Sequence, residues 1–221
     1  MHNIVNNLLS IQSEIKLKIN ELNFKNYQPN IVAVSKTFSM QDILPLINHG
    51  HIHFGENKVQ EAIEKWTNLK NDFKHLKLHM IGKLQTNKVK YVVPLFDYIH
   101  SVDNMKLAEK ISQEQIKNNK IMKLFIQINI GNENQKTGIL EDQLENFFNI
   151  CTKELDLNII GIMCLPPNDN QSSKYFSKMI QLIKKIKLKE TSMGMSNDYL
   201  DAVSYQSTYL RIGSKIFGER N

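Results

Sequence analysis

The sequence predicts an α/β protein that forms a single (β/α)8 barrel of the TIM type, preceded by an extra N-terminal helix. Eight short apolar runs alternate with segments whose apolar residues recur at helical spacing. Many of the runs are continuously apolar, which is typical of parallel strands buried on both faces. The alternative is a doubly wound open sheet, but the runs are short and no GxGxxG turn follows the first of them. Eight such units in a chain of 221 residues therefore favour the barrel.

The expected elements follow one another in a regular order. Residues 3–22 read as an amphipathic helix before the first strand. The strands are the β-rich apolar runs Ile31–Ser35, Ile52–Phe54, Leu78–Ile81, Tyr98–Val102, Lys123–Asn129, Ile159–Cys164, Thr191–Met193 and Tyr209–Ile212. Helical spacing marks Ser39–Asn48, Lys58–Leu69, Lys88–Val93, Met105–Ile116, Leu140–Leu155, Tyr175–Ile186 and the shorter Asp198–Tyr205. Pro45 lies inside the first of these, so that helix should start late or kink there.

The domain organisation is expected to be simple. No Gly/Ser/Pro-rich linker or low-complexity block divides the chain, which favours one domain over residues 1–221. Residues 1–30 form its N-terminal helix and lead-in, and residues 31–221 form the barrel. No apolar run approaches the roughly 18 residues that a membrane span needs. The first 18 residues mix acids and polar residues with apolar ones and lack a small-residue cleavage site, so they do not resemble a signal peptide.

The amino-acid composition indicates the cellular compartment and the classes of binding partner that we expect. Cys151 and Cys164 are too few for a disulfide framework and fit a reducing cytoplasm. The net charge is +6, but only Arg211 and Arg220 among the 28 basic residues are arginines, and the lysines are scattered along the chain. A nucleic-acid binder would more often concentrate its basic residues and use arginine for bidentate contacts. We therefore expect no nucleic-acid partner.

Lys36 is the first candidate for chemistry. It ends the run IVAVSK, and side-chain alternation places it on the same face as Val32 and Val34. If that face is the barrel interior, Lys36 enters a partly desolvated mouth, which lowers the pKa of its ammonium group and leaves an amine suited to attack an aldehyde. The alternative is a solvated lysine at a strand end.

Further candidates follow the last two strands, whose loops often bind phosphate in barrels. Gly194 stands near Ser196 after strand seven, and Gly213 precedes Ser214 after strand eight. Glycine lets the backbone approach a ligand, and serine with exposed amides at a helix start attracts an anion. A turn with a helix N-cap explains either pair equally well. Arg211, inside strand eight, offers either a permanent charge to a ligand or a structural ion pair to a barrel carboxylate.

Other polar residues are weaker candidates. Asn57 follows strand two and could present its amide to a ligand or cap the next helix. His51 and His53 have the spacing of paired metal ligands, but they lie at the start of a strand and no further ligands complete a site, so we expect no metal. Core or pocket-lining roles suffice for His79 and His100. Cys164 reads as a small buried thiol.

Eight motifs, in order over nearly the whole chain, resemble those of the pyridoxal phosphate homeostasis proteins, the YggS/PROSC family. The fold of that family is similar to the N-terminal barrel of bacterial alanine racemase. The motifs are AVSKT (Ala33–Thr37), FGENKVQE (Phe54–Glu61), HMIGKLQTNK (His79–Lys88), IHSVD (Ile99–Asp103), QINIGNENQKTGI (Gln127–Ile139), GIMCLPP (Gly161–Pro167), SMGMSND (Ser192–Asp198) and RIGSKIFGER (Arg211–Arg220).

The resemblance implies pyridoxal 5′-phosphate as cofactor, held as an aldimine on Lys36. It implies that Asn57 lies near the cofactor ring and that Arg211 faces the pyridine nitrogen, where a permanent cation disfavours ring protonation and weakens the cofactor as an electron sink. The phosphate would be held by Ser196, Gly213 and Ser214. Gln206 departs from the pattern, because family members usually have glycine before the Ser-Thr pair, and this could alter the turn into strand eight. Pro45 is a second departure.

The resemblance also implies a binding protein that buffers or delivers the cofactor, with transient contacts to apo-enzymes that need it. Alanine racemases continue into a second β-domain that supplies a catalytic tyrosine across a dimer, whereas this chain ends nine residues after Ile212. Racemisation needs an acid and a base on opposite faces of the substrate carbon, and no second group beside Lys36 is evident. We therefore assign no catalytic residue and expect a monomer. A small monomeric pyridoxal-phosphate enzyme, such as a weak racemase, is the alternative, and a cofactor-free Schiff-base aldolase is a third.

Overall fold

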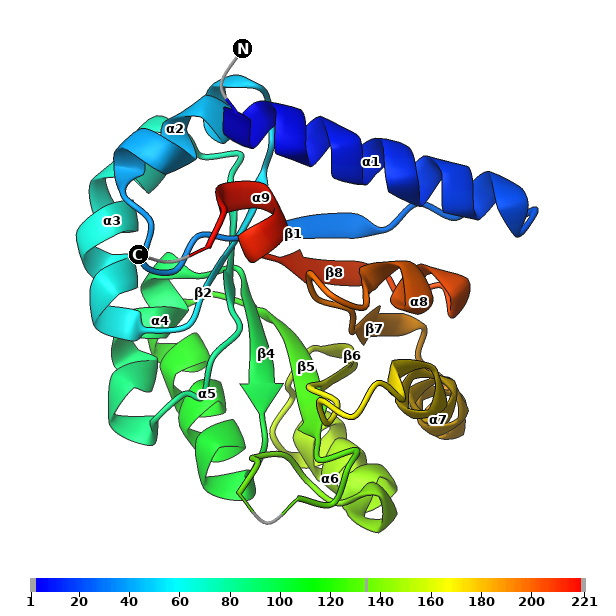
Figure 1. Ribbon diagram of the computed structural model, residues 1–221. Coiled ribbons are helices and arrows are strands. Elements are labelled where there is room, and N and C mark those ends of the chain that lie inside the picture. Colours follow the sequence, from blue (N-terminus) through cyan, green and yellow to red (C-terminus); the bar gives the residue numbers. More distant parts are fainter. Residues whose placement is uncertain (1–2, 134, 220–221) are drawn as a thin grey trace.

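Eight parallel strands close into a barrel in the computed structural model, which describes residues 3–133 and 135–219 (Figure 1). The strands pair in chain order, and β1 pairs with β8 to close the ring. This closure confirms the predicted (β/α)8 fold and excludes the open sheet. The strands are β1 (Asn30–Val34), β2 (His53–Glu56), β3 (Lys77–Met80), β4 (Tyr98–Val102), β5 (Lys123–Ile128), β6 (Ile159–Cys164), β7 (Glu190–Ser192) and β8 (Tyr209–Ile212).

Helices surround the barrel and follow the strands, as expected for parallel pairing. They are α1 (Asn3–Glu21), α2 (Met40–Asn48), α3 (Val59–Asp72), α4 (Val89–Leu95), α5 (Met105–Asn118), α6 (Leu144–Asn149), α7 (Ser172–Lys185), α8 (Tyr199–Ser204) and α9 (Ser214–Phe217). The helix expected over Leu140–Leu155 is divided: a 3₁₀ turn at Glu141–Gln143 precedes α6, and a π-helical turn at Ile150–Glu154 follows it. No helix of the described ranges is both long and apolar enough to cross a membrane.

The start of α2 differs from one expectation. The helix begins at Met40, five residues before Pro45, so the late start does not occur. Its first turn is held by Asp42, whose carboxylate accepts the backbone N–H of Ser39 at 3.0 Å and the Ser39 hydroxyl at 2.7 Å. This contact at the N-terminus fixes the first turn before the proline is reached.

Two cores lie on the two faces of the barrel wall. The interior cluster fills the barrel and consists of Val32, Tyr98, Phe125, Met163 and Tyr209. The larger outer core packs the other face of the strands against the helices and includes Ile31 and Ala33. This alternation along β1 confirms that the face carrying Val32 points inward.

Helix α1 lies across the seam where β1 meets β8, beside α9 (Figure 1). The Asn7 side-chain amide donates to the Ile216 carbonyl at 2.9 Å, and after the helix the Tyr27 hydroxyl donates to the Ser207 carbonyl at 2.7 Å. The buried face of α1 consists of Ile4, Val5, Leu8, Ile11 and Ile15. The extra helix thus joins the first and last parts of the barrel.

Gln206 takes a conformation that glycine favours in the turn into β8. This residue takes the left-handed conformation, with φ of 55°, and its N–H donates to the Val203 carbonyl at 2.9 Å. A left-handed position is one that glycine occupies without strain. The geometry therefore explains why glycine suits this position and shows that glutamine adopts it.

Substitution of Gly194 should be costly. Gly194 follows β7 with φ of 93°, and a Cβ added there would lie 2.5 Å from the Ala202 Cβ. We expect Gly194→Ala to lower the free energy of unfolding by about 2–4 kcal/mol, because strain and overpacking add. Gly50→Ala is the matched control, since its φ is 94° and nothing lies within 4 Å of an added Cβ; it should cost about 1 kcal/mol. Urea unfolding measures both, and equal losses would contradict the packing argument.

Candidate functional site

A cavity of about 550 Å³ opens at the carboxyl ends of the strands, where barrels carry their sites. It is lined from β1, β2, β3, β6, β7 and β8 or from the loops that follow them. All six predicted site residues line it: Lys36, Asn57, Ser196, Arg211, Gly213 and Ser214. The structure therefore brings these residues together around one space, while their individual roles remain predictions.

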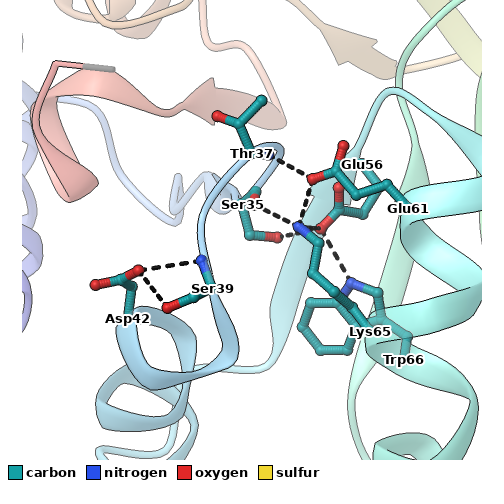
Figure 2. Close-up of polar contacts among 8 residues, drawn as sticks. All are labelled: Ser35, Thr37, Ser39, Asp42, Glu56, Glu61, Lys65 and Trp66. Atoms are coloured by element: carbon teal, nitrogen blue, oxygen red, sulfur yellow. Dashed lines mark hydrogen bonds and ion pairs between the residues drawn. The ribbon is translucent and has the colours of Figure 1, made fainter. Parts of the chain in front are cut away.

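Lys36 lies in the turn after β1. Its two neighbours, Ser35 and Thr37, are held by helix α3 (Figure 2). Thr37 has φ of 70°, a left-handed conformation that is rare for a β-branched residue. Its N–H donates to Glu61 Oε1 at 2.5 Å, and the Ser35 carbonyl accepts from Lys65 Nζ at 2.8 Å. The contacts on both sides stabilise a strained turn and so fix the position of Lys36.

A buried carboxylate anchors this arrangement. Glu56, at the end of β2, is fully buried, and its Oε1 accepts from the Ser35 hydroxyl at 2.8 Å, from Lys65 Nζ at 3.0 Å and from Trp66 Nε1 at 3.0 Å (Figure 2). Lys65 also pairs with Glu61 at 2.7 Å. Burial raises the pKa of Glu56, and Lys65 opposes that rise. The Glu56–Lys65 pair thus links β1, β2 and α3 beneath the Lys36 turn.

Ser196 and Gly213 join the loops that follow β7 and β8. The Ser196 hydroxyl oxygen accepts from the Gly213 N–H at 3.3 Å and from the Lys215 N–H at 3.4 Å. The N-cap of α8 is Asp198, so Ser196 does not have the capping role that was its alternative. Ser214 lies beside these amides on the cavity wall. Hydroxyls and backbone N–H groups converge here, which suits an anion.

Arg211 lies on the cavity wall, 3% exposed, and its guanidinium donates to Ser192 Oγ at 2.5 Å and to the Cys164 carbonyl at 2.8 Å. No carboxylate among residues 3–133 and 135–219 lies within ion-pair distance of it, so the structural ion pair is not found. Burial lowers the pKa of Arg211, but a guanidinium stays charged in proteins. Arg220 lies outside the described residues.

Asn57 lines the cavity and carries an unsatisfied polar atom. Its Oδ1 is buried without a hydrogen-bond partner among the described residues. The N-cap of α3 is Lys58, so Asn57 does not cap that helix. Gly82 packs directly against its backbone, because an added Cβ would lie 2.4 Å from the Asn57 carbonyl oxygen. A buried amide without a partner is costly unless a ligand satisfies it.

The weaker candidates do not reach this cavity as metal or catalytic groups. The His51 ring hydrogen-bonds to the His53 carbonyl and the His53 ring to His79, and no group of three or more possible metal ligands occurs within the described parts of the chain. His79 and His100 are fully buried in the barrel. Burial raises the pKa of the Cys164 thiol to about 12, which leaves it unreactive.

Some lining residues were not expected. The loop after β6 contributes four of them, and residues near the ends of β3 and β7 contribute the rest. They are Leu165, Pro166, Pro167, Asn168, Ile81, Gly82, Met195, Asn197 and Asp198. Only their position could have identified these residues in the sequence, since each follows the carboxyl end of a strand. The contacts of Glu61 and Lys65 with the turn after β1 could not be predicted from the local sequence, because they depend on how α3 packs against that turn.

Comparison with known proteins identifies the family. A model of the alanine racemase N-terminal domain matches residues 13–221. The pyridoxal phosphate homeostasis protein of Haemophilus influenzae is 34% identical over 99% of this chain and 97% of its own length. The solved structure of PipY from Synechococcus elongatus with pyridoxal phosphate bound is 29% identical, with a TM-score of 0.79 over 92% of this chain and 100% of PipY. An alanine racemase from Corynebacterium glutamicum is 15% identical, with a TM-score of 0.65 over 96% of this chain and 61% of the racemase, and shares the fold. This chain therefore belongs to the family of pyridoxal phosphate homeostasis proteins, within the alanine racemase N-terminal domain fold.

Proposed function

We propose that this protein binds pyridoxal 5′-phosphate in the cavity at the carboxyl ends of its strands and serves to buffer or deliver that cofactor. The observation that carries the proposal is the convergence of Lys36, Arg211 and the Ser196–Ser214 loops on one cavity. Relatives with this fold are named for pyridoxal phosphate homeostasis, and PipY has been solved with the cofactor bound.

The donor set fits the cofactor's chemistry. An aldehyde needs an amine, and Lys36 lines the cavity from a turn that is held on both sides. A phosphate needs hydroxyl and backbone N–H donors, which Ser196, Gly213 and Ser214 supply. Asn57 lines the same wall, and its buried Oδ1 has no partner among the described residues. The residues present therefore suit the group that the family binds.

The chain's own residues then have separate tasks. Lys36 would supply the amine with which the cofactor's aldehyde can react. Ser196, Gly213 and Ser214 would hold the phosphate, and Arg211 would supply a permanent positive charge to the ring. When bound, the cofactor supplies an electron sink, and a cation beside its ring weakens that property. These roles favour holding the cofactor over using it.

Few groups on the cavity wall could drive turnover. Its titratable lining residues, within the part of the chain that the structure describes, are Lys36, Asp198 and Arg211. Asp198 accepts the Met195 N–H at 2.6 Å, and burial raises the pKa of its carboxyl. Two-base chemistry needs an acid and a base on opposite faces of a substrate carbon. We therefore propose a carrier that contacts apo-enzymes transiently, acts as a monomer and works in a reducing compartment, where both buried thiols stay free.

Reduction with borohydride tests the binding proposal. Purified protein mixed with pyridoxal phosphate should turn yellow, and borohydride should bleach it and leave a cofactor-sized mass on the peptide that contains Lys36. Mass spectrometry of the digest locates the adduct. An adduct confined to exposed lysines would contradict the site, and colourless protein would contradict the cofactor.

A second assay separates carrier from enzyme. Loaded protein incubated with a panel of L-amino acids should leave their chirality unchanged in chiral chromatography. Sustained conversion to the D-form would instead establish a racemase.

A further inference from the structure

Five side chains inside the barrel form one unbroken hydrogen-bond chain. His53 Nδ1 lies 2.9 Å from His79 Nε2, and His79 Nδ1 lies 2.9 Å from His100 Nε2. His100 Nδ1 lies 2.8 Å from Ser192 Oγ, which is 2.5 Å from the Arg211 guanidinium. This hydrogen-bond chain therefore joins β2, β3, β4, β7 and β8. It ends at Arg211, which lines the proposed cofactor cavity.

Arg211 fixes the direction of every bond in this chain. A guanidinium only donates, so Ser192 Oγ accepts from it, and the serine proton must go elsewhere. Within residues 3–133 and 135–219, His100 Nδ1 is the one acceptor within hydrogen-bond distance of that hydroxyl. A neutral imidazole that accepts at Nδ1 carries its proton on Nε2. His100 therefore donates to His79, and His79 donates to His53.

Packing keeps the three histidines neutral. His79 and His100 are fully buried, and burial lowers the pKa of each well below its usual value. The Tyr98 ring stacks on His79, with centroids 4.1 Å apart, and the Phe125 ring stacks on His100 at 4.4 Å. Cationic rings in this apolar cluster beside Arg211 would be costly.

The far end of the chain lies in a different environment. His53 is half-buried and lines a second cavity of about 650 Å³, between α1 and the start of β2. Burial lowers the pKa of His53 to about 4. Lys77, Lys123 and His51 act in the same sense, whereas Asp97 opposes them. The ring is thus neutral near pH 7, and its Nε2–H is a donor at this end.

We propose that Ser192 and His100 are positioning residues, which hold the Arg211 guanidinium against the cofactor cavity through a hydrogen-bond chain of fixed direction. The role of Arg211 toward the cofactor rests on the proposed function. The donor-to-acceptor direction of the hydrogen bonds rests on the structure alone. The two parts can therefore fail separately.

The direction is tested on protein without cofactor. In ¹⁵N spectra of histidine-labelled protein near pH 7, His53, His79 and His100 should each show a protonated Nε2 and an unprotonated Nδ1. A protonated Nδ1 on any of the three would overturn the inference, and so would a cationic ring. This measurement needs no variant and so does not depend on whether a variant folds.

The positioning role is tested by Ser192→Ala, with Ser101→Ala as matched control. Ser101 is a buried serine on β4 whose hydroxyl takes no part in the chain. Ser192→Ala should weaken pyridoxal phosphate binding about tenfold and release His100 from its single tautomer. Ser192→Thr, which keeps the hydroxyl, should restore both, and Ser101→Ala should change neither.

The outcomes separate the two proposals. Binding that Ser192→Ala leaves unchanged would overturn the positioning role alone. Wild-type protein that shows the expected tautomers but binds no pyridoxal phosphate would overturn the proposed function, and with it the role of Arg211 toward the cofactor.

Discussion

Replacement of Lys36 by alanine is expected to abolish the yellow colour of the protein mixed with pyridoxal phosphate and to remove the borohydride adduct. The variant lacks the amine that would bond to the aldehyde, whereas the serines and backbone amides that we propose for the phosphate remain. Absorbance and intact-mass spectrometry measure the loss. The cofactor should still bind weakly without a covalent bond.

The fold should survive this change. Lys36 lies in a turn held mainly by its neighbours Ser35 and Thr37, so we expect its removal to alter the free energy of unfolding by no more than about 1 kcal/mol. Lys25→Ala, at an exposed lysine before β1, is the control and should keep the colour and the adduct. A Lys36→Ala protein that stays yellow after excess cofactor is removed and still forms the borohydride adduct would refute the assignment.

The largest stability effect is expected at Lys65. Lys65→Met leaves the fully buried Glu56 without its cation and removes the contact to the Ser35 carbonyl. Breaking a buried ion pair from one side costs about 3–5 kcal/mol, because the remaining charge stays desolvated. Urea unfolding should show this loss, and cofactor binding should weaken with it because the Lys36 turn loses its support.

Two further variants isolate the cause. Lys58→Met removes an exposed lysine at the start of the same helix and should be close to neutral. Adding Glu56→Gln to Lys65→Met removes the stranded charge and should recover part of the loss. If the double variant is as unstable as the sum of the two single ones, the charge is not the cause.

The pH dependence of this loss has a definite sign. The pKa of Glu56 is raised in the folded protein by burial, so its contribution to stability is present below the usual carboxyl pKa and is lost as the pH rises through the folded value. Without Lys65 that pKa rises further. The deficit of Lys65→Met should therefore be smaller near pH 4 than near pH 7. A deficit that is independent of pH would point to lost packing instead.

Much of the fold follows from local pattern. β4, β6 and β8 begin and end where the β-rich runs of the sequence do. The signal is clearest for β6, because a strand buried on both faces leaves a continuous apolar run. Side-chain alternation along β1 predicted that Lys36 lies on the same face as Val32, at the mouth of the barrel, and Lys36 does line the cavity there. The division of the helix predicted over Leu140–Leu155 was not foreseen, because apolar spacing does not distinguish an α-helix from one that contains a π-helical turn.

The remaining features depend on geometry between elements. His79 pairs in register with Gly55 and not with His53, so the stagger of the barrel, which no local pattern encodes, brings the two rings together. The contacts that hold the turn around Lys36 likewise come from Glu61 and Lys65 on α3, a helix that packs against this turn. The sequence predicted the six residues that line the cavity, but not the residues that hold them in position.

The seam between β1 and β8 has a consequence for folding. Asn30 pairs with Tyr209, so ring closure joins segments that lie far apart along the chain, and contacts of such high sequence separation slow the search for the native state. Lys36 and Arg211 stand on opposite sides of that seam. A half-made barrel therefore has no cofactor pocket, and the gain of cofactor colour during refolding should coincide with the last cooperative step. If pyridoxal phosphate binds in this cavity as proposed, it would report on the completed ring and stabilise it by mass action.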